Sequence, residues 1–214
     1  MKAISWRFES SCLHHFFLQR IIGDMELLKQ RIEKDGNVRM PNIVKVDSFL
    51  NHQIDVDLLD EIGAEFYRRF KDKGITKIVT IEASGIAIAC SAARYFKVPV
   101  VFAKKHENKT MDDDVYQVTI HSFTKGKDYE AKISKRYLDS SDTVLIIDDF
   151  LANGEAAKGL TAMVEMSGAE IAGIGIVIEK GFQNGGKTLR EMGICVESLA
   201  VIENIKEDKV VFKK

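Results

Sequence analysis

From residue 55 onward, hydrophobic positions alternate between a helical and an extended spacing. Apolar residues recur three and four positions apart over 56–73, which predicts a helix. The β-branched run 75–81 that follows is typical of a buried strand. The same alternation predicts helix 86–96, strand 98–103, strand 143–148, helix 153–167, strand 171–179 and strand 194–202. Strands separated by helices imply parallel pairing, so we expect an α/β fold with a mostly parallel central sheet flanked by helices.

Residues 104–135 interrupt this alternation. The segments VYQVTIHSF (115–123) and YEAKISK (129–135) alternate apolar and polar residues around a Lys-Gly-Lys turn, which predicts an inserted antiparallel hairpin. The polar stretch before it, residues 104–114, suggests a mobile lid, because long insertions at strand ends often close over a site. A surface hairpin without chemistry explains the same pattern.

The first 24 residues do not fit the pattern. Polar residues interrupt the apolar stretch that a secretory signal requires, so export is not expected. A regular helix begins at Met25 and reaches a stop signal at Gly36. We therefore expect residues 1–24 to be an N-terminal extension outside the core, with Met25 as the natural start and 25–214 as a single domain. An amphipathic targeting segment is the alternative.

Composition excludes several classes of protein. The 214 residues are 45% hydrophobic and 29% charged, which are globular proportions in a chain long enough to bury a core. Because 31 Lys and Arg face 32 Asp and Glu, the chain lacks the basic field that nucleic-acid binding requires. No apolar run approaches the roughly 18 residues of a membrane span. The 3 cysteines lie far apart, so we expect reduced thiols and no protein-bound structural metal.

The most informative loop joins strand 143–148 to helix 153–167. In open parallel sheets, ligands bind at the carboxyl ends of the strands. Here Asp148 and Asp149 end the strand, and Gly154 stands where the helix begins. Free backbone amides at a helix start suit phosphate, and carboxylates accept hydrogen bonds from sugar hydroxyls. A ribose phosphate would satisfy both halves, whereas an Asp pair that only caps the helix is the alternative.

Three other groups lie at ends of predicted strands. Ser84 and Gly85 form a small-residue turn that could bind an anion or be only a tight turn. Lys104-Lys105 ends strand 98–103 and is either a solvated pair or a counter-charge for phosphate. Lys180, with Phe182 two residues on, offers a cation to an oxo group and a ring to a flat base. A surface lysine beside a core phenylalanine would look the same.

Four segments in order resemble the type I phosphoribosyltransferases, and among them the bacterial xanthine phosphoribosyltransferases. They are VDSFLNHQID (46–55), IEASGIAIA (81–89), IIDDFLANGEAA (146–157) and GIGIVIEKGF (173–182). The resemblance covers Met25 to the C-terminus and implies the type I phosphoribosyltransferase fold with a small hood. It implies transfer of the 5-phosphoribosyl group from phosphoribosyl pyrophosphate (PRPP) to xanthine, giving xanthosine monophosphate and pyrophosphate in cytoplasmic purine salvage. Mg²⁺ would arrive on PRPP, and the chain would act as a homodimer.

The resemblance also assigns residues. Asp148 and Asp149 would be the catalytic pair that faces the ribose hydroxyls. PRPP would further contact Ala152, Asn153, Gly154, Glu155, Ala156, Ser84, Gly85 and Lys105. Xanthine would contact Val44, Asn51, Lys180 and Phe182, with the Asn51 amide donating to the 2-oxo group. Many relatives have threonines where Ala152 and Ala156 stand, so the loop here depends more on backbone amides.

Two other functions fit the same motifs. Lys180 with Phe182 suits any 6-oxopurine, so guanine or hypoxanthine could replace xanthine as the acceptor. A non-catalytic regulator that senses PRPP is the second alternative. Such regulators carry a DNA-binding domain before this fold, and residues 1–45 are too short for one.

Overall fold

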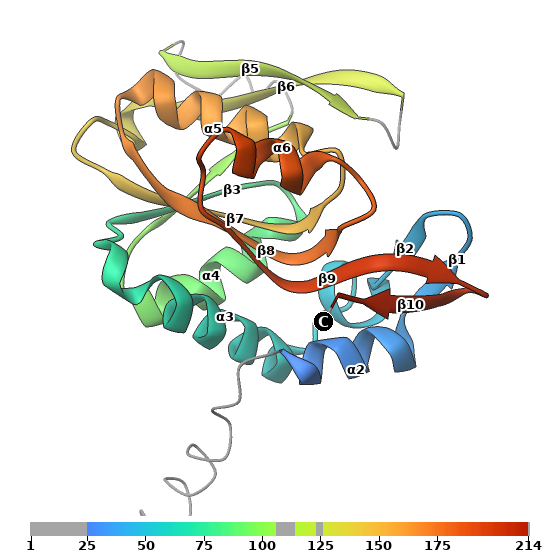
Figure 1. Ribbon diagram of the computed structural model, residues 1–214. Helices are drawn as coiled ribbons and strands as arrows, with labels where there is room; N and C mark the ends of the chain where they lie inside the picture. Colours follow the sequence, from blue (N-terminus) through green and yellow to red (C-terminus); the bar gives the residue numbers. More distant parts are fainter. Residues whose placement is uncertain (1–24, 106–113, 123–125, 214) are drawn as a thin grey trace, which may run out of the picture.

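A six-stranded sheet forms the centre of the computed structural model, which describes residues 25–105, 114–122 and 126–213 (Figure 1). The strand order is β10-β9-β8-β7-β3-β4. These strands are β3 (Lys77–Ile81), β4 (Val100–Ala103), β7 (Thr143–Leu151), β8 (Glu170–Lys180), β9 (Val196–Lys206) and β10 (Lys209–Phe212). Every neighbouring pair is parallel except β9 with β10. The expected mostly parallel sheet is therefore confirmed, and β10 adds an antiparallel edge that the sequence pattern did not predict.

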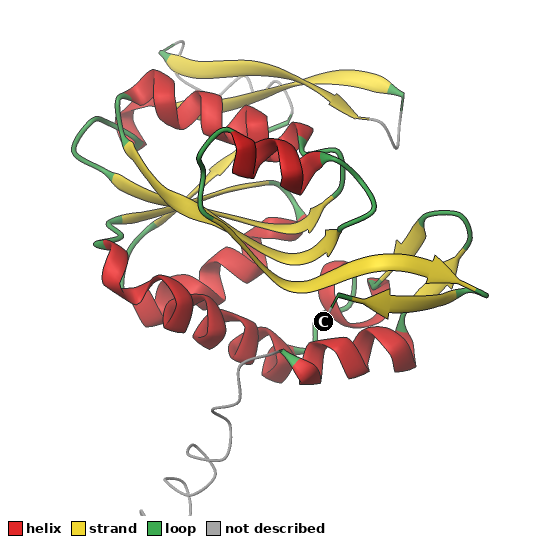
Figure 2. Cartoon of the chain, in the orientation of Figure 1, coloured by secondary structure: helices red, strands yellow, loops and turns green. Residues whose placement is uncertain are grey.

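Helices cover both faces of this sheet (Figure 2). The helices α3 (Val56–Phe70) and α4 (Ser84–Phe96) lie on one face, and α5 (Glu155–Ser167) and α6 (Gly185–Glu191) lie on the other. Leu145 and Ile147 of β7 pack into the cluster beneath α3 and α4, while Val144 and Ile146 pack beneath α5. Burial on both faces explains why this strand reads as a continuous apolar run. Within the described ranges, no helix is long and apolar enough to cross a membrane.

Two element boundaries differ from the prediction in ways that affect the site. Strand β7 continues to Leu151, so Asp148 and Asp149 lie inside the hydrogen-bonded strand rather than at its end. Helix α4 begins at Ser84, which places Ser84 and Gly85 in its first turn rather than in the preceding loop. Both shifts are of the size expected where helices and strands end, since terminal residues follow tertiary contacts more than local preference.

A small hood packs beside β9 and β10 (Figure 1). It consists of α2 (Glu26–Asp35), the two-stranded hairpin β1 (Asn37–Arg39) and β2 (Ile43–Lys45), and a π-helical turn at Asp47–Asn51. Leu28 and Ile32 of α2 are fully buried and join the core cluster of α3 and α4. The helix predicted after Met25 and the hood implied by the resemblance are thus present. The predicted extension, residues 1–24, lies outside the described residues.

The inserted hairpin consists of β5 (Val115–Ser122) and β6 (Lys127–Ser134), as predicted. Ile120 of β5 is 2% exposed and packs against Gly159 of α5, where a Cβ would lie 2.6 Å from Ile120 Cδ1. Reciprocal backbone hydrogen bonds of 2.9 and 3.0 Å between Lys104 and Lys132 join β6 to the end of β4. The described strands are therefore anchored at two places. The rest of the predicted lid, 106–113 and 123–125, lies outside the described ranges.

We expect Ile120→Ala to loosen the hairpin from α5, because it leaves a cavity against Gly159 that costs about 2–5 kcal/mol. Amide hydrogen exchange followed by mass spectrometry should accelerate over 115–134, while β7 and β8 keep their protection. Thr119→Ala is the matched control, since this side chain is exposed on the same strand. Equal exchange in Ile120→Ala and the wild type would contradict the anchoring role.

Candidate active site

Two adjacent carboxyl groups are buried near the end of the central strand β7. Asp148 is 5% exposed and Asp149 is 9% exposed. The backbone N–H of Asp149 donates to Asp148 Oδ1 at 3.0 Å. Burial, together with the charge of Asp149, raises the pKa of Asp148 well above its ordinary value, and the charge of Lys105 only partly opposes this. Such a costly pair is typical of a functional site rather than of a helix cap.

The loop after β7 leads into α5 through a left-handed glycine. Gly154 has φ +85° and is the N-cap of α5, with no side chain capping the helix. The N-cap residue therefore supplies no side-chain acceptor to the first N–H groups of α5, and a helix start of this kind can bind anions. Glu155, the one carboxylate in this turn, forms an ion pair with Lys158 at 3.0 Å. That pairing limits repulsion between Glu155 and an anion at the loop 152–156.

The start of α4 lies against Asp148. A Cβ at Gly85 would collide with Thr80 Oγ1 and lie 3.4 Å from Asp148 Oδ1. Glycine is therefore required for this close approach, and Ser84 beside it faces the same edge of the sheet. The peptide between Glu82 and Ala83, just before this turn, is cis.

Lys105 approaches the same edge from the end of β4. Its backbone N–H donates to Glu82 Oε1 at 2.5 Å, and its Nζ lies 5.2 Å from the ring centre of Tyr129 on β6. Burial and the charge of Asp148 raise the pKa of Tyr129, so this phenol lies within electrostatic reach of the acidic pair. Sequence reasoning did not single out Tyr129, because only the folded hairpin brings it here.

Asn51 reaches the acidic pair from the hood. Its Nδ2 donates to Asp149 Oδ2 at 3.1 Å, although the two residues are 98 positions apart. A pocket of about 520 Å³ separates the hood from the start of α4. It is lined by Asp47, Asn51, His52, Ala83 and Ser84. The hood therefore closes one side of the site, a placement that the sequence alone could not reveal.

Lys180 ends β8 and extends toward the hood. Its Nζ donates to the Asn42 carbonyl oxygen at 2.9 Å and lies 5.8 Å from the ring centre of Phe150. Burial lowers the pKa of Lys180. The aromatic ring beside Lys180 is thus Phe150, the residue directly after the acidic pair. Its place in the sequence, directly after Asp149, could have indicated that Phe150 lies at the site, but the sequence analysis did not single it out.

Two of the residues assigned to the base are less directly placed. Val44, in β2, is 7% exposed and its side chain packs into the hydrophobic core. Phe182 is 36% exposed in the loop between β8 and α6. The structure therefore gathers Asp148, Asp149, Asn51, Ser84, Gly85 and Lys105 at one edge of the sheet, while the Val44 side chain lies inside and Phe182 at the surface.

Comparison with known proteins identifies the family. Residues 45–208 match the family model described as a phosphoribosyl transferase domain. Xanthine phosphoribosyltransferases from Clostridium novyi and Ruminiclostridium cellulolyticum are 62% and 61% identical to this chain. Each alignment covers 88% of this chain, and 100% and 99% of the relatives. The chain belongs to the xanthine phosphoribosyltransferase family. It is therefore a transferase with a phosphoribosyl transferase domain.

Solved structures confirm the fold of this phosphoribosyltransferase. Adenine phosphoribosyltransferase from Rhodothermus marinus has a TM-score of 0.67 at 18% identity, covering 83% of this chain and 99% of that one. The enzyme from Trypanosoma brucei, in complex with AMP, pyrophosphate and ribose-5-phosphate, has a TM-score of 0.68 at 18% identity. That match covers 85% of this chain and 83% of the other. At this identity the likeness shows the shared type I fold.

Asp148→Asn should stabilise the ligand-free enzyme at neutral pH. Because the pKa of Asp148 is raised in the folded state, this carboxyl ionises first in the unfolded chain as pH rises above 3.8. Ionisation stabilises the unfolded chain, so the free energy of unfolding of the wild type falls. Asparagine carries no charge, so the gain in unfolding free energy should be small at about pH 4 and largest at about pH 7. Urea unfolding at both pH values measures this. A gain of equal size at both would contradict the burial argument.

Proposed function

We propose that this enzyme transfers the 5-phosphoribosyl group of PRPP to xanthine, forming xanthosine monophosphate and pyrophosphate in purine salvage. The observation that carries this proposal is the buried Asp148–Asp149 pair beside an uncapped helix start, in a chain 62% identical to a xanthine phosphoribosyltransferase. Carboxylates next to outward-facing amides match the two halves of a ribose phosphate.

PRPP binds along the edge of the sheet. Its ribose hydroxyls donate to Asp148 and Asp149, and its 5-phosphate accepts from the backbone amides of 152–156. Its pyrophosphate lies against Ser84, Gly85 and the ammonium group of Lys105. The closeness of Gly85 to Asp148 supports this arrangement, because it places the start of α4 beside the ribose carboxylates.

Xanthine binds between the hood and the end of β8. Lys180 donates to the 6-oxo group, while Asn51 donates to the 2-oxo group with the amide hydrogen that Asp149 does not use. Val44 contributes through packing or its backbone, and Phe182 closes the loop side. Guanine would place an amino donor against the Asn51 donor, a polar mismatch that discriminates strongly between bases.

The reaction proceeds through charge balance and positioning. The bond from the anomeric carbon to pyrophosphate breaks as the bond to the base nitrogen forms, and the proton on that nitrogen is lost to the departing pyrophosphate or to water. Bond breaking runs ahead of bond making, so the sugar becomes transiently cationic. Asp148 and Asp149 provide negative charge close to that sugar, and Lys105 provides positive charge to the departing pyrophosphate. No covalent intermediate with the protein is required, because alignment of the two substrates supplies much of the rate enhancement.

Mg²⁺ would be carried by PRPP, as the family resemblance implies. Among the residues that the structure describes, no three His, Cys, Asp or Glu side chains lie together so as to hold a metal ion. The acidic pair nevertheless fits an Mg²⁺–PRPP complex, since Mg²⁺ prefers oxygen ligands and few of them from protein. When bound, the ion neutralises charge on the leaving pyrophosphate.

We also propose a cytoplasmic homodimer whose single domain is 25–214 and whose partners are PRPP and xanthine, not nucleic acid or membrane. The net charge of −1 supports this choice of partners, and the family resemblance supports the dimer. Light scattering coupled to size exclusion measures the assembly.

The base preference is tested by incubating the enzyme with Mg²⁺, PRPP and each of xanthine, guanine, hypoxanthine and adenine. We expect nucleotide formation chiefly with xanthine, because only its 2-oxo group accepts from Asn51. Turnover of guanine or hypoxanthine instead would be consistent with the proposed PRPP site but would refute the proposed contacts to the base. PRPP binding without transfer to any base would favour a sensor.

The acidic pair is tested with the double variant Asp148→Asn/Asp149→Asn. Loss of both charges near the cationic sugar should lower kcat on the order of 10²–10³-fold while the protein stays folded. Steady-state kinetics with circular dichroism measure both properties. Asp139→Asn, an exposed carboxylate at the other end of β7, is the control and should retain wild-type turnover. Near-normal kcat in the double variant would refute the assignment.

A further inference from the structure

Helix α6 begins where the loops after β7 and β8 meet. The N–H of Gly185 donates to the Ala152 carbonyl oxygen at 3.0 Å. A Cβ at Gly185 would lie only 2.7 Å from the Gly154 nitrogen and 2.8 Å from the Asn153 carbonyl carbon. Only glycine permits so close an approach, and the first residue of α6 therefore sets the position of the loop 152–154.

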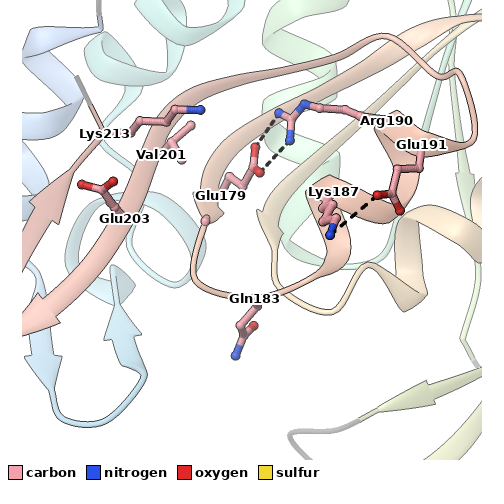
Figure 3. A pocket seen from close by; sticks show the side chains of 9 residues that line it. Glu179, Gln183, Lys187, Arg190, Glu191, Val201, Glu203 and Lys213 are labelled. Atoms are coloured by element: carbon pink, nitrogen blue, oxygen red, sulfur yellow. Dashed lines mark hydrogen bonds and ion pairs between the residues drawn. The ribbon is translucent and has the colours of Figure 1, made fainter.

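The other end of α6 is fastened to β8 by a bidentate ion pair (Figure 3). Arg190 Nη1 and Nη2 donate to the two carboxylate oxygens of Glu179, each at 2.8 Å. Ser198 Oγ, from β9, donates to Glu179 Oε2 at 2.5 Å. The Glu179 side chain is 6% exposed, and the next residue along β8 is Lys180. A forked pair fixes orientation as well as distance.

Gly186 packs directly on this pair. A Cβ there would lie 2.6 Å from Arg190 Nη1 and 2.7 Å from Glu179 Cδ. Burial on its own would raise the pKa of Glu179, but the hydrogen bonds from Arg190 and Ser198 outweigh it and lower that pKa. The carboxylate is thus charged at neutral pH and held from two sides. Helix α6 consequently contacts the loop 152–154 at its start and is joined at its end to Glu179, the residue before Lys180.

We propose that Glu179 and Arg190 are positioning residues that hold the loop 152–154 and Lys180 in one fixed geometry through α6. The inference rests on the proposed function, which places the 5-phosphate in that loop and the base at Lys180. The enzyme must hold the 5-phosphate and the base of the nucleotide product at the same time. A shift of α6 would therefore misplace the two substrates relative to each other. Misplacement by about 1 Å can cost on the order of 100-fold in rate.

The test compares Arg190→Met with Lys187→Met in the full chain. Lys187 lies on the same helix, is 74% exposed, and pairs with Glu191 at 3.7 Å on the surface. We expect Arg190→Met to lower kcat/KM by about 100-fold and to raise KM for both PRPP and the base. Lys187→Met should stay within about twofold of wild type, since exposed pairs contribute little. Arg190→Lys should restore part of the loss, because lysine keeps the charge but not the fork.

A second readout separates positioning from overall stability. The Arg190 side chain is 43% exposed and that of Glu179 is 6% exposed. Removing one partner of such a part-buried pair also destabilises the fold, so kinetics are measured well below the melting temperature of each variant. Amide hydrogen exchange of the ligand-free protein should rise at both 152–154 and 181–186 in Arg190→Met, and not in Lys187→Met. If Arg190→Met does not fold, Glu179→Gln keeps the shape of the side chain and should show the same pattern with smaller amplitude.

Several outcomes would overturn the inference. A lower melting temperature with wild-type KM values and wild-type exchange at both loops would make the pair purely structural. A rise in KM for only one substrate would refute the coupling through α6. Failure of the proposed function is recognised separately, because the wild-type enzyme would then transfer phosphoribosyl to no base, whereas failure of this inference leaves wild-type transfer intact.

Discussion

Two carboxyl groups on consecutive residues are buried near the end of the central strand. Burying them is energetically unfavourable, and the neighbouring groups offset part of that free energy. Burial and mutual repulsion disfavour the charged form of Asp148, as its raised pKa indicates. The contacts that offset this cost come from different elements: an amide donor from Asn51 in the hood and the charge of Lys105 after β4. In the proposed mechanism, a cationic sugar that forms between these groups would relieve the same repulsion, so the ground-state cost would become transition-state stabilisation.

Parallel strands explain why the remaining groups lie close together. The carboxyl ends of β3, β4, β7 and β8 point to one edge of the sheet, where Gly85, Lys105, the loop 152–154 and Lys180 follow them. The helices that start or end at this edge then determine distances between the loops. Helix α6 is the clearest example, since one end contacts the loop 152–154 and the other is tied to Glu179.

The fold-defining elements were predictable because their signals are local. Continuous apolar runs identified the parallel strands, and helical spacing identified α3 and α5. The short pieces were not predictable by the same means. The seven-residue helix α6 begins with two glycines, and the strands β1 and β2 have three residues each, too few for any periodicity to be detected. Within the described residues, the strands β1 and β2 pair only with each other and pack beside β10, and α6 is joined to the loop before α5 by the Gly185 N–H, so these pieces depend on neighbouring elements.

The sequence by itself determined the acidic pair, the glycine at the start of α5 and the order of strands and helices, because each depends on residues close together along the chain. Only the tertiary structure decided which side chains meet across elements. It placed Asn51 on Asp149, Phe150 beside Lys180, and Tyr129 within reach of Asp148. Such contacts depend on how whole elements pack, and packing is a property of the folded chain that no local pattern of residues encodes.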